Sequence, residues 1–299
     1  MLFAAIDIGS NAGRLLITTV YERFGRPFTD KATMTRVPLR LGLDVFEKGY
    51  ISETKIDKTI KTIKAYQLLM DVYEPVMFRA CATAAVREAD NKDEVLGRIK
   101  EACGINLEMV DGIEEAKIIS KATNTNFQLV YENTLFIDVG GGSTEISYFA
   151  DGAFVKSKSF PIGTIRLLLD KVHSDDWEDM KQWVKSTREN HGEVNCICSG
   201  GNINKLTKLY GDIDKHTISK EQLNKAYSKL KALSLDERIN KMGLRPDRAD
   251  VIVPAAKIFR KLSKWGRLPN LIAPRIGLAD GLAIEMYKAH KREQLKNQQ

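Results

Sequence analysis

The stretch FAAIDIGSNAGRLL, residues 3–16, sets the plan of the fold, and LFIDVGGGSTEISY, residues 135–148, repeats it. In both stretches an apolar run ends near an Asp, a glycine follows two positions after the Asp, and a second run resumes after a short turn. Apolar runs bounded by Gly, Ser and Asn predict a strand, a turn and a strand. The two aspartates, Asp7 and Asp138, lie 131 positions apart. A repeat of this length indicates two copies of one domain rather than a solenoid of short units.

Helix and strand patterns alternate around these two hairpins. Helices are predicted after Ser52, from Asn91 to Gly104 and over 114–123, and strands over 76–82 and 105–110. In the second half, Ser219 and Ser234 each open a capping box, and a final helix begins near Asp280. Such alternation predicts an α/β architecture.

The polar segment 122–126 is the best candidate for a domain boundary. We therefore predict an N-terminal domain over 1–123 and a C-terminal domain over 124–299. The last helix, about 280–299, either stays with the C-terminal domain or packs back on the N-terminal domain.

The composition excludes several classes of protein. With 43% hydrophobic and 28% charged residues, the chain has the composition of a globular protein. No apolar run approaches the ~20 residues of a membrane span, and the start MLFAAIDIGS lacks the basic region of a signal peptide. The four cysteines form no zinc-binding pair of motifs and the four histidines no HExxH or HD pair. We expect a cytoplasmic protein with reduced, mostly buried thiols and no contact with membranes.

The positive charge is concentrated late in the chain. Between Lys257 and Lys296 there are ten Lys or Arg and three Asp or Glu, a surplus equal to the net charge of +7 of the whole chain. A basic region suggests an acidic partner, and a basic helix that is merely solvated is the alternative.

Each predicted hairpin carries the residue types of a phosphate and metal site. Glycines let backbone N–H groups approach phosphate oxygens, and an Asp at a strand end can hold Mg²⁺. Two such turns in register with a duplication predict that Asp7 and Asp138 face one cleft. Two ordinary hairpins are the alternative.

The IDIGSN and IDVGGGSTE pair is similar to the phosphate loops of the actin-like ATPase superfamily. The chain resembles more closely the exopolyphosphatase/guanosine pentaphosphate phosphohydrolase (Ppx/GppA) family. This resemblance rests on eight short segments in the family's order: AIDIGSNAGRLL, ACATAAVREADN, DGIEEAK, IDVGGGSTEIS, FPIGTIRLL, CSGGN, RADVIVPA and RIGLADG. It implies two actin-like (ribonuclease H-like) α/β domains with a cleft between them.

The resemblance also implies roles for individual residues. Glu115 matches the general base for water, with Glu114 as the alternative, and Arg87 matches a clamp on phosphate. Asp7, Asp138 and Glu145 match acidic positions around Mg²⁺ or Mn²⁺. The phosphate-binding positions are Gly9, Ser10, Asn11, Arg14, Gly140, Gly141, Gly142, Ser143, Thr144, Gly200 and Gly201.

The implied activity is release of terminal phosphate from inorganic polyphosphate or guanosine pentaphosphate. The partner is then a polyphosphate or a guanosine polyphosphate, with no specific nucleic acid, and a homodimer is left open. This sequence departs from the family at Ala12, where a hydroxyl residue is usual, and at Asn202, where Thr is usual. A non-catalytic sensor of polyphosphate or pppGpp and an ATP-dependent kinase for small molecules are the alternative functions.

Overall fold

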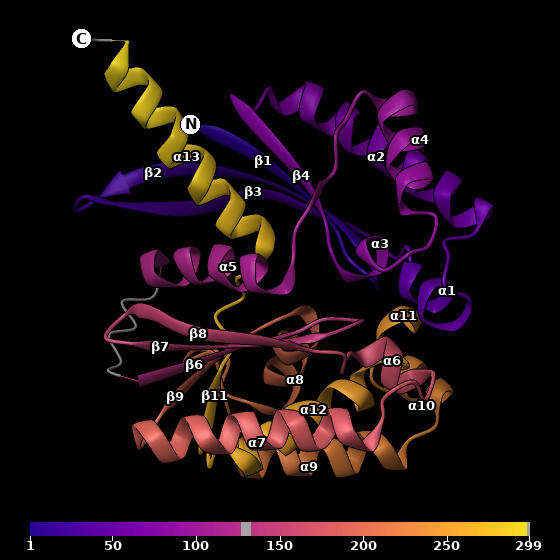
Figure 1. The fold of residues 1–299 in the computed structure, drawn as a ribbon, viewed down its shortest axis with the longest axis vertical. Helices are drawn as coiled ribbons and strands as arrows, with labels where there is room; N and C mark the ends of the chain where they lie inside the picture. The colour runs from indigo at the N-terminus through magenta and orange to yellow at the C-terminus, as the bar shows by residue number, and fades with distance from the viewer. Residues whose placement is uncertain (127–132, 298–299) are drawn as a thin grey trace. The chain divides into compact units, whose positions relative to one another are not determined.

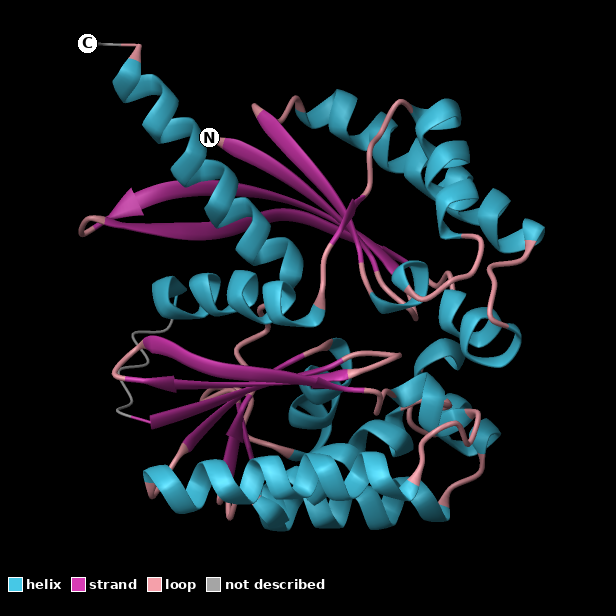
Figure 2. Ribbon diagram, in the orientation of Figure 1, coloured by secondary structure: helices cyan, strands magenta, loops and turns pink. Residues whose placement is uncertain are grey.

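The computed structural model describes residues 1–126 and 133–297. The chain divides into two compact units, of which unit 1 combines residues 1–128 with 276–299 and unit 2 consists of residues 129–275 (Figure 1). Each unit contains one mixed β-sheet with helices packed on it (Figure 2). None of the helices in the described part of the chain is long and apolar enough to cross a membrane.

The sheet of unit 1 has five strands in the order β3-β2-β1-β4-β5. The first three strands are antiparallel, and β1, β4 and β5 run parallel. The strand predicted over 105–110 is much shorter than expected, because only two of its residues pair with β4. The strands are β1 (Leu2–Ile8), β2 (Gly13–Arg23), β3 (Arg26–Val37), β4 (Met77–Ala82) and β5 (Glu108–Met109).

Helices of unit 1 contact different parts of its sheet. The C-terminal helix α13 contacts β1 to β4 and helix α5, whereas α2 contacts β2 and α4. Asn91 is the N-cap residue of α4, as predicted, but its side chain bonds to the main chain of Ile51 instead of capping the helix. The helices are α1 (Leu41–Lys48), α2 (Glu53–Tyr73), α3 (Ala84–Arg87), α4 (Lys92–Cys103), α5 (Gly112–Asn126) and α13 (Leu278–Lys296).

Unit 2 has a six-stranded sheet in the order β10-β11-β9-β6-β7-β8. Both predicted capping boxes are present, at Ser219 and Ser234. The strands are β6 (Asn133–Val139), β7 (Thr144–Ala150), β8 (Ala153–Phe160), β9 (Asn195–Ser199), β10 (Thr217–Ser219) and β11 (Asn270–Ile272). The helices are α6 (Thr164–Leu168), α7 (Ser174–His191), α8 (Gly201–Tyr210), α9 (Lys220–Ala232), α10 (Leu235–Asn240), α11 (Pro246–Ala249) and α12 (Ile252–Trp265).

The two sheets share one topology. Reading β8-β7-β6-β9-β11 in unit 2 gives the same order and the same pairing directions as β3-β2-β1-β4-β5 in unit 1, and β10 is added at the edge of unit 2. The sequence repeat is therefore a structural repeat, and the predicted fold class of two ribonuclease H-like α/β units is confirmed.

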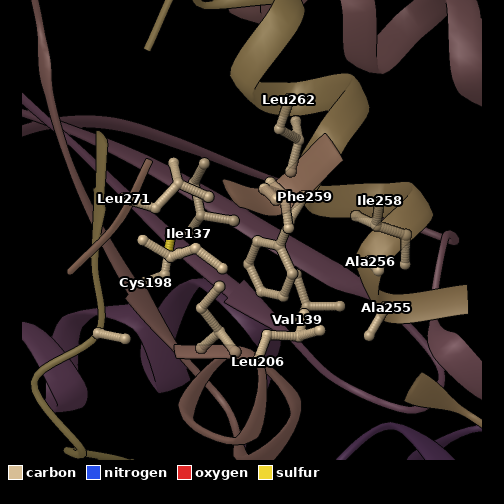
Figure 3. Packing of buried hydrophobic residues seen from close by; sticks show 14 of the residues in the cluster. Ile137, Val139, Cys198, Leu206, Ala255, Ala256, Ile258, Phe259, Leu262 and Leu271 are labelled. Atoms are coloured by element: carbon tan, nitrogen blue, oxygen red, sulfur yellow. The ribbon is translucent and has the colours of Figure 1, made fainter. Parts of the chain in front are cut away.

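The core of unit 2 lies between its sheet and the helices α7, α9 and α12. Figure 3 shows Phe259 of α12 beside Val139 of β6, with Leu262 and Ile137 nearby. Because side chains alternate along a strand, the core residues Ile137 and Val139 place Asp138 on the opposite face of the sheet. The four cysteines of the chain are buried and free, as predicted.

Candidate active site

The two hairpins have the same strand register around their aspartates. Asp7 pairs with Arg14 across β1 and β2, and Asp138 pairs with Glu145 across β6 and β7, with the aspartate followed by Ile8↔Gly13 in one and Val139↔Thr144 in the other. The turns close with the same bond: Gly9 N to Ala12 O at 3.1 Å, and Gly140 N to Ser143 O at 2.9 Å. Directly opposed residues of antiparallel strands share a face of the sheet, so each Asp lies beside its partner.

In unit 1 the buried Asp7 forms an ion pair. Its carboxylate is 2.7 Å from Nη1 of Arg14, and Asp7 is only 3% exposed. The strand neighbour on the other side is Cys81, and burial raises the pKa of this thiol to about 12, so it stays protonated. Arg14, which was predicted to bind phosphate, therefore already holds a carboxylate in this structure.

In unit 2 the position opposite the aspartate is acidic. Asp138 and Glu145 are 8% and 2% exposed, and they face each other directly across the strand pair. Each accepts a bond from a serine hydroxyl: Ser199 donates to Asp138, and Ser159 donates to Glu145 at 2.8 Å. Two buried carboxylates side by side raise each other's energy unless a cation or a proton accompanies them. Carboxylate oxygens are the ligands that Mg²⁺ prefers, so this pair fits a divalent cation.

No group of three or more His, Cys, Asp or Glu in a metal-holding arrangement occurs among residues 1–126 and 133–297. Two protein carboxylates are nevertheless enough for Mg²⁺, which keeps several waters and also binds substrate phosphates. Asp7 belongs to the other unit, so its share in the metal site stays a prediction.

The glycine turn of unit 2 is fixed from its carbonyl side. The N–H of Thr164 donates to the carbonyl of Gly140 at 3.0 Å, and the N–H of Ile165 donates to that of Gly141 at 2.8 Å. Nε of Arg166 donates to the carbonyl of Gly142 at 2.7 Å. In a trans peptide the N–H points away from the C=O. The N–H groups of residues 141–143 therefore point away from α6 as three successive donors, which is an anion-binding arrangement.

These bonds from α6 to the carbonyls of residues 140–142 form a clamp on the turn, and close packing maintains it. A Cβ on Gly163 would lie 2.2 Å from the carbonyl oxygen of Gly141, so only glycine fits there without displacing the turn. Thr144, which was predicted to contact phosphate, is fully buried, and its hydroxyl donates to the carbonyl of Ile162 at 2.5 Å. That hydroxyl ties β7 to the segment that precedes α6.

The first turn of unit 1 is braced in the same way. The N–H of Gly42 donates to the carbonyl of Ser10 at 2.9 Å, and that of Arg40 donates to Asn11 at 3.0 Å. The N–H groups of residues 11 and 12 therefore point away from this support. Ala12, which stands where a hydroxyl residue is usual, is only 2% exposed, so this position is almost inaccessible to solvent.

Gly200 and Gly201 bring the end of β9 to the second hairpin. Gly200 has φ +106, and a Cβ there would lie 3.0 Å from the carbonyl oxygen of Val139 and 3.6 Å from Oδ1 of Asp138. Arg248 of α11 donates to the carbonyl of Gly201 and, at 3.4 Å, to Oδ1 of Asn202. The unusual Asn202 thus has a partner in the segment RADVIVPA.

Glu114 and Glu115 lie in the first turn of α5. Asp111 caps this helix, since its Oδ1 accepts the N–H groups of Ile113 at 2.9 Å and Glu114 at 2.8 Å. The side chain of Glu114 is exposed and that of Glu115 is half-buried. Arg87 donates to the carbonyl of Val110 at 2.7 Å, which brings the predicted phosphate clamp to the start of the helix that carries the predicted base.

Helix α13 holds α5 in place. A Cβ on Gly281 would lie 2.2 Å from the carbonyl oxygen of Ile118, so the two helices cross at backbone contact. Glu285 of α13 accepts bonds from Lys121 of α5 and, at 2.8 Å, from Arg79 of β4.

The predicted site residues fall into two groups. Unit 2 gathers Asp138, Glu145 and the glycines of its two turns, and unit 1 carries Asp7 with its turn, Arg87 and Glu115. The prediction that both groups share one cleft concerns both units and stays a prediction. Four residues with structural roles here were not predicted: Arg166, Arg248, Ser159 and Ser199.

Comparison with known proteins identifies consistent relatives. A model of the Ppx/GppA phosphatase family matches residues 29–290. A bifunctional 3-dehydroquinate synthase/phosphatase of Fusobacterium nucleatum is 29% identical over 87% of this chain, which spans only 43% of that protein. Exopolyphosphatase 1 of Mycobacterium leprae is 26% identical over 95% of this chain and 92% of its own length. The Aquifex aeolicus Ppx/GppA family member has a similar structure, with a TM-score of 0.77 and 25% identity over 97% of this chain and 98% of that one.

Proposed function

The chain belongs to the Ppx/GppA phosphatase family, and from this premise we propose that it releases the terminal phosphate of inorganic polyphosphate or guanosine pentaphosphate by metal-assisted attack of water. The observation that carries the proposal is the second hairpin. It holds the opposed carboxylates Asp138 and Glu145 at one end of the same short turn whose N–H groups form an anion-binding arrangement.

This combination suits phosphoryl transfer because that reaction needs positioning and charge neutralisation more than covalent chemistry. The N–H groups of residues 141–143 would bind phosphate oxygens, and the clamp by α6 keeps them oriented before the substrate arrives. Pre-oriented donors favour the transition state because they need no reorganisation as charge develops.

Asp138 and Glu145 would hold the divalent cation, Mg²⁺ or Mn²⁺. When bound, the cation neutralises charge on the phosphate oxygens and orients the scissile bond. The serines that donate to each carboxylate would fix its orientation, as partners of metal ligands commonly do.

Glu115 is the proposed base that orients and deprotonates the attacking water. Its half-buried side chain supports this choice over the exposed Glu114, and Arg87 donates to the carbonyl of Val110 just before α5. A base must lie within hydrogen-bond reach of its water. The backbone contact between α13 and α5 would help to keep α5, and with it Glu115, in position.

The test is a phosphate-release assay with Mg²⁺ and, in parallel, long polyphosphate, tripolyphosphate and guanosine pentaphosphate. We expect release from at least one substrate, and its loss in Asp138→Asn and after chelation. Ser186→Ala, an exposed change on α7, is the matched control with full activity. Binding of these ligands without release would overturn the proposal in favour of a sensor, and acceptor-dependent consumption of ATP would overturn it in favour of a kinase.

A further inference from the structure

A basic and aromatic surface covers part of the outer side of the helices in unit 2. It consists of Trp177 and Lys181 on α7 and Lys257, Lys261, Lys264 and Trp265 on α12. Helix α12 carries four Lys or Arg and no Asp or Glu. Its lysines recur at a spacing of four and then three residues, so they form one row along the helix, about 6 Å and then about 4.5 Å apart along the axis.

Two of the three ammonium groups of this row, those of Lys257 and Lys261, lie over tryptophan rings. Nζ of Lys261 lies 4.7 Å from the ring centroid of Trp177 and 5.2 Å from that of Trp265, and Nζ of Lys257 lies 5.7 Å from the Trp177 centroid. The two rings meet edge to face at 6.1 Å. Cation–π contacts of this kind are stabilising because the ammonium charge is attracted to the negative face of the ring. They also favour positions of Lys257 and Lys261 beside the rings.

The α12 part of the surface concentrates like charges, whereas the neighbouring α7 also carries acidic residues next to Trp177. Burial lowers the pKa of Lys261, and the charges of Lys257, Arg260, Lys264 and Lys181 each lower it further. Of these cations, Lys181 has a carboxylate partner, Glu178, at 2.8 Å. Cations placed close together repel one another, which destabilises the fold when no ligand is bound. The same cluster attracts a polyanion.

We propose that this surface is a second binding site, for the chain of long inorganic polyphosphate, separate from the carboxylate pair of Asp138 and Glu145. The two sites lie on opposite faces of the unit 2 sheet, because the core residues Ile137 and Val139 face the helices and Asp138 points the other way. The choice of ligand rests on the proposed function. A chain anchored here raises the local concentration of its own ends, which a short substrate cannot do.

The geometry favours polyphosphate over nucleic acid. Proteins that bind single strands need aromatic faces on which bases stack. Here lysine ammonium groups already lie over Trp177 and Trp265, so the rings orient cations instead of offering a stacking platform. A ligand with closely spaced phosphates and no bases matches this surface best.

The test compares two triple variants in binding to end-labelled long polyphosphate, measured by fluorescence anisotropy in chelator so that no hydrolysis occurs. The surface variant is Lys257→Gln, Lys261→Gln and Lys264→Gln. The control, Lys61→Gln, Lys64→Gln and Lys100→Gln, removes the same charge from exposed helix positions of unit 1. We expect about tenfold weaker binding and a salt slope smaller by about 2 for the surface variant, by analogy with single-stranded nucleic acids. Tripolyphosphate should bind both variants alike.

Equal binding of long polyphosphate by the two triple variants would overturn the proposal. So would an equal loss for tripolyphosphate, or a loss for single-stranded RNA as large as that for polyphosphate. Lys264→Glu alone, at an exposed position, tests the surface without disturbing the Trp contacts and should weaken binding about threefold. Because the assay needs no turnover, it stands even if the phosphatase assay fails. If the surface variant still releases phosphate from tripolyphosphate and binds long polyphosphate normally, the second site is rejected while the proposed function is retained.

Discussion

The two hairpins have the same backbone and opposite chemistry. In both, an aspartate lies one residue before the end of a central strand, the turn closes with the same hydrogen bond, and a helical segment binds the carbonyls of the turn. The residue opposite the aspartate is Arg14 in unit 1 and Glu145 in unit 2. The first hairpin therefore places a cationic side chain beside its buried aspartate, whereas the second places a further carboxylate there. One side chain in a duplicated frame therefore separates an ion pair from the pair of carboxylates that we propose as the metal ligands.

The largest expected effect comes from copying unit 1 into unit 2. Glu145→Arg would place a guanidinium opposite Asp138, as Arg14 lies opposite Asp7, and an ion pair would replace the metal. Loss of several kcal/mol of charge stabilisation corresponds to a decrease of about 10⁴-fold in phosphate release. Glu145→Gln, which keeps the volume, should recover part of its activity at high Mg²⁺. Substantial activity of folded Glu145→Arg, with folding checked by thermal melting, would contradict the role of the pair.

The next effect tests the contribution of unit 1 outside its hairpin. Glu115→Gln removes a base without removing volume, so turnover should fall about 10³-fold while the affinity for substrate changes little. Glu114→Gln is the matched control, because the neighbouring side chain is exposed. Single-turnover kinetics together with a binding assay measure both quantities. If Glu114→Gln is the damaging change, the assignment of the base moves by one residue.

A smaller effect should follow from loosening the clamp of the second turn. In Gly163→Ala the new methyl group would lie 2.2 Å from the carbonyl oxygen of Gly141, so the turn must shift. Displacement of aligned donors can reduce kcat/KM by about 10²-fold. Gly97→Ala is a matched control, because its Cβ would meet no atom within 4 Å and helix α4 should become slightly more stable. Similar kinetics of the two variants would show that the turn does not depend on α6.

The smallest effect concerns the stability of unit 1 and its dependence on pH. Burial raises the pKa of Glu285, but the bonds from Lys121 and Arg79 outweigh it, so the net pKa is lowered from 4.5. A lowered folded-state pKa means that the carboxylate stabilises unit 1 above about pH 4.5 and that this contribution disappears as the pH falls through the lower value. Glu285→Gln should therefore cost about 1 kcal/mol at pH 7 and progressively less below pH 4. Denaturation curves of both proteins between pH 7 and pH 3 measure this difference in unfolding free energy. A difference that does not change with pH would contradict the proposed role of the Glu285 ion pairs.

Much of the fold could be predicted from local patterns. The hairpins were predicted because an apolar run, an Asp and a glycine turn lie next to one another in sequence. The strand β3 was not predicted, because RPFTDKATMTRV is a partly exposed edge strand without apolar alternation. The strand over 105–110 was predicted too long, because a sequence pattern does not show how far a neighbouring strand extends.

The site residues that were missed depend on contacts across long distances in the chain. Ser199 lies 61 positions from the Asp138 that it contacts, and Arg248 lies 47 positions from Gly201. Arg166 belongs to FPIGTIRLL, one of the segments that carry the family resemblance, but its role depends on a bond to the carbonyl of Gly142 that no motif specifies. Residue types indicated the chemistry, whereas register and packing determined which side chains support it.

The split composition of unit 1 has a consequence for synthesis. Unit 2 is continuous in sequence, so it can fold as soon as its residues have left the ribosome. Unit 1 lacks α13 until the segment after residue 275 has been made, although α13 contacts four of its strands and supplies Gly281 and Glu285 against α5. A nascent chain interrupted before α13 therefore exposes the surface of β1 and leaves α5, which carries the proposed base, without its support. Such chains expose apolar surface and should therefore be recognised by chaperones and proteases until α13 has been made.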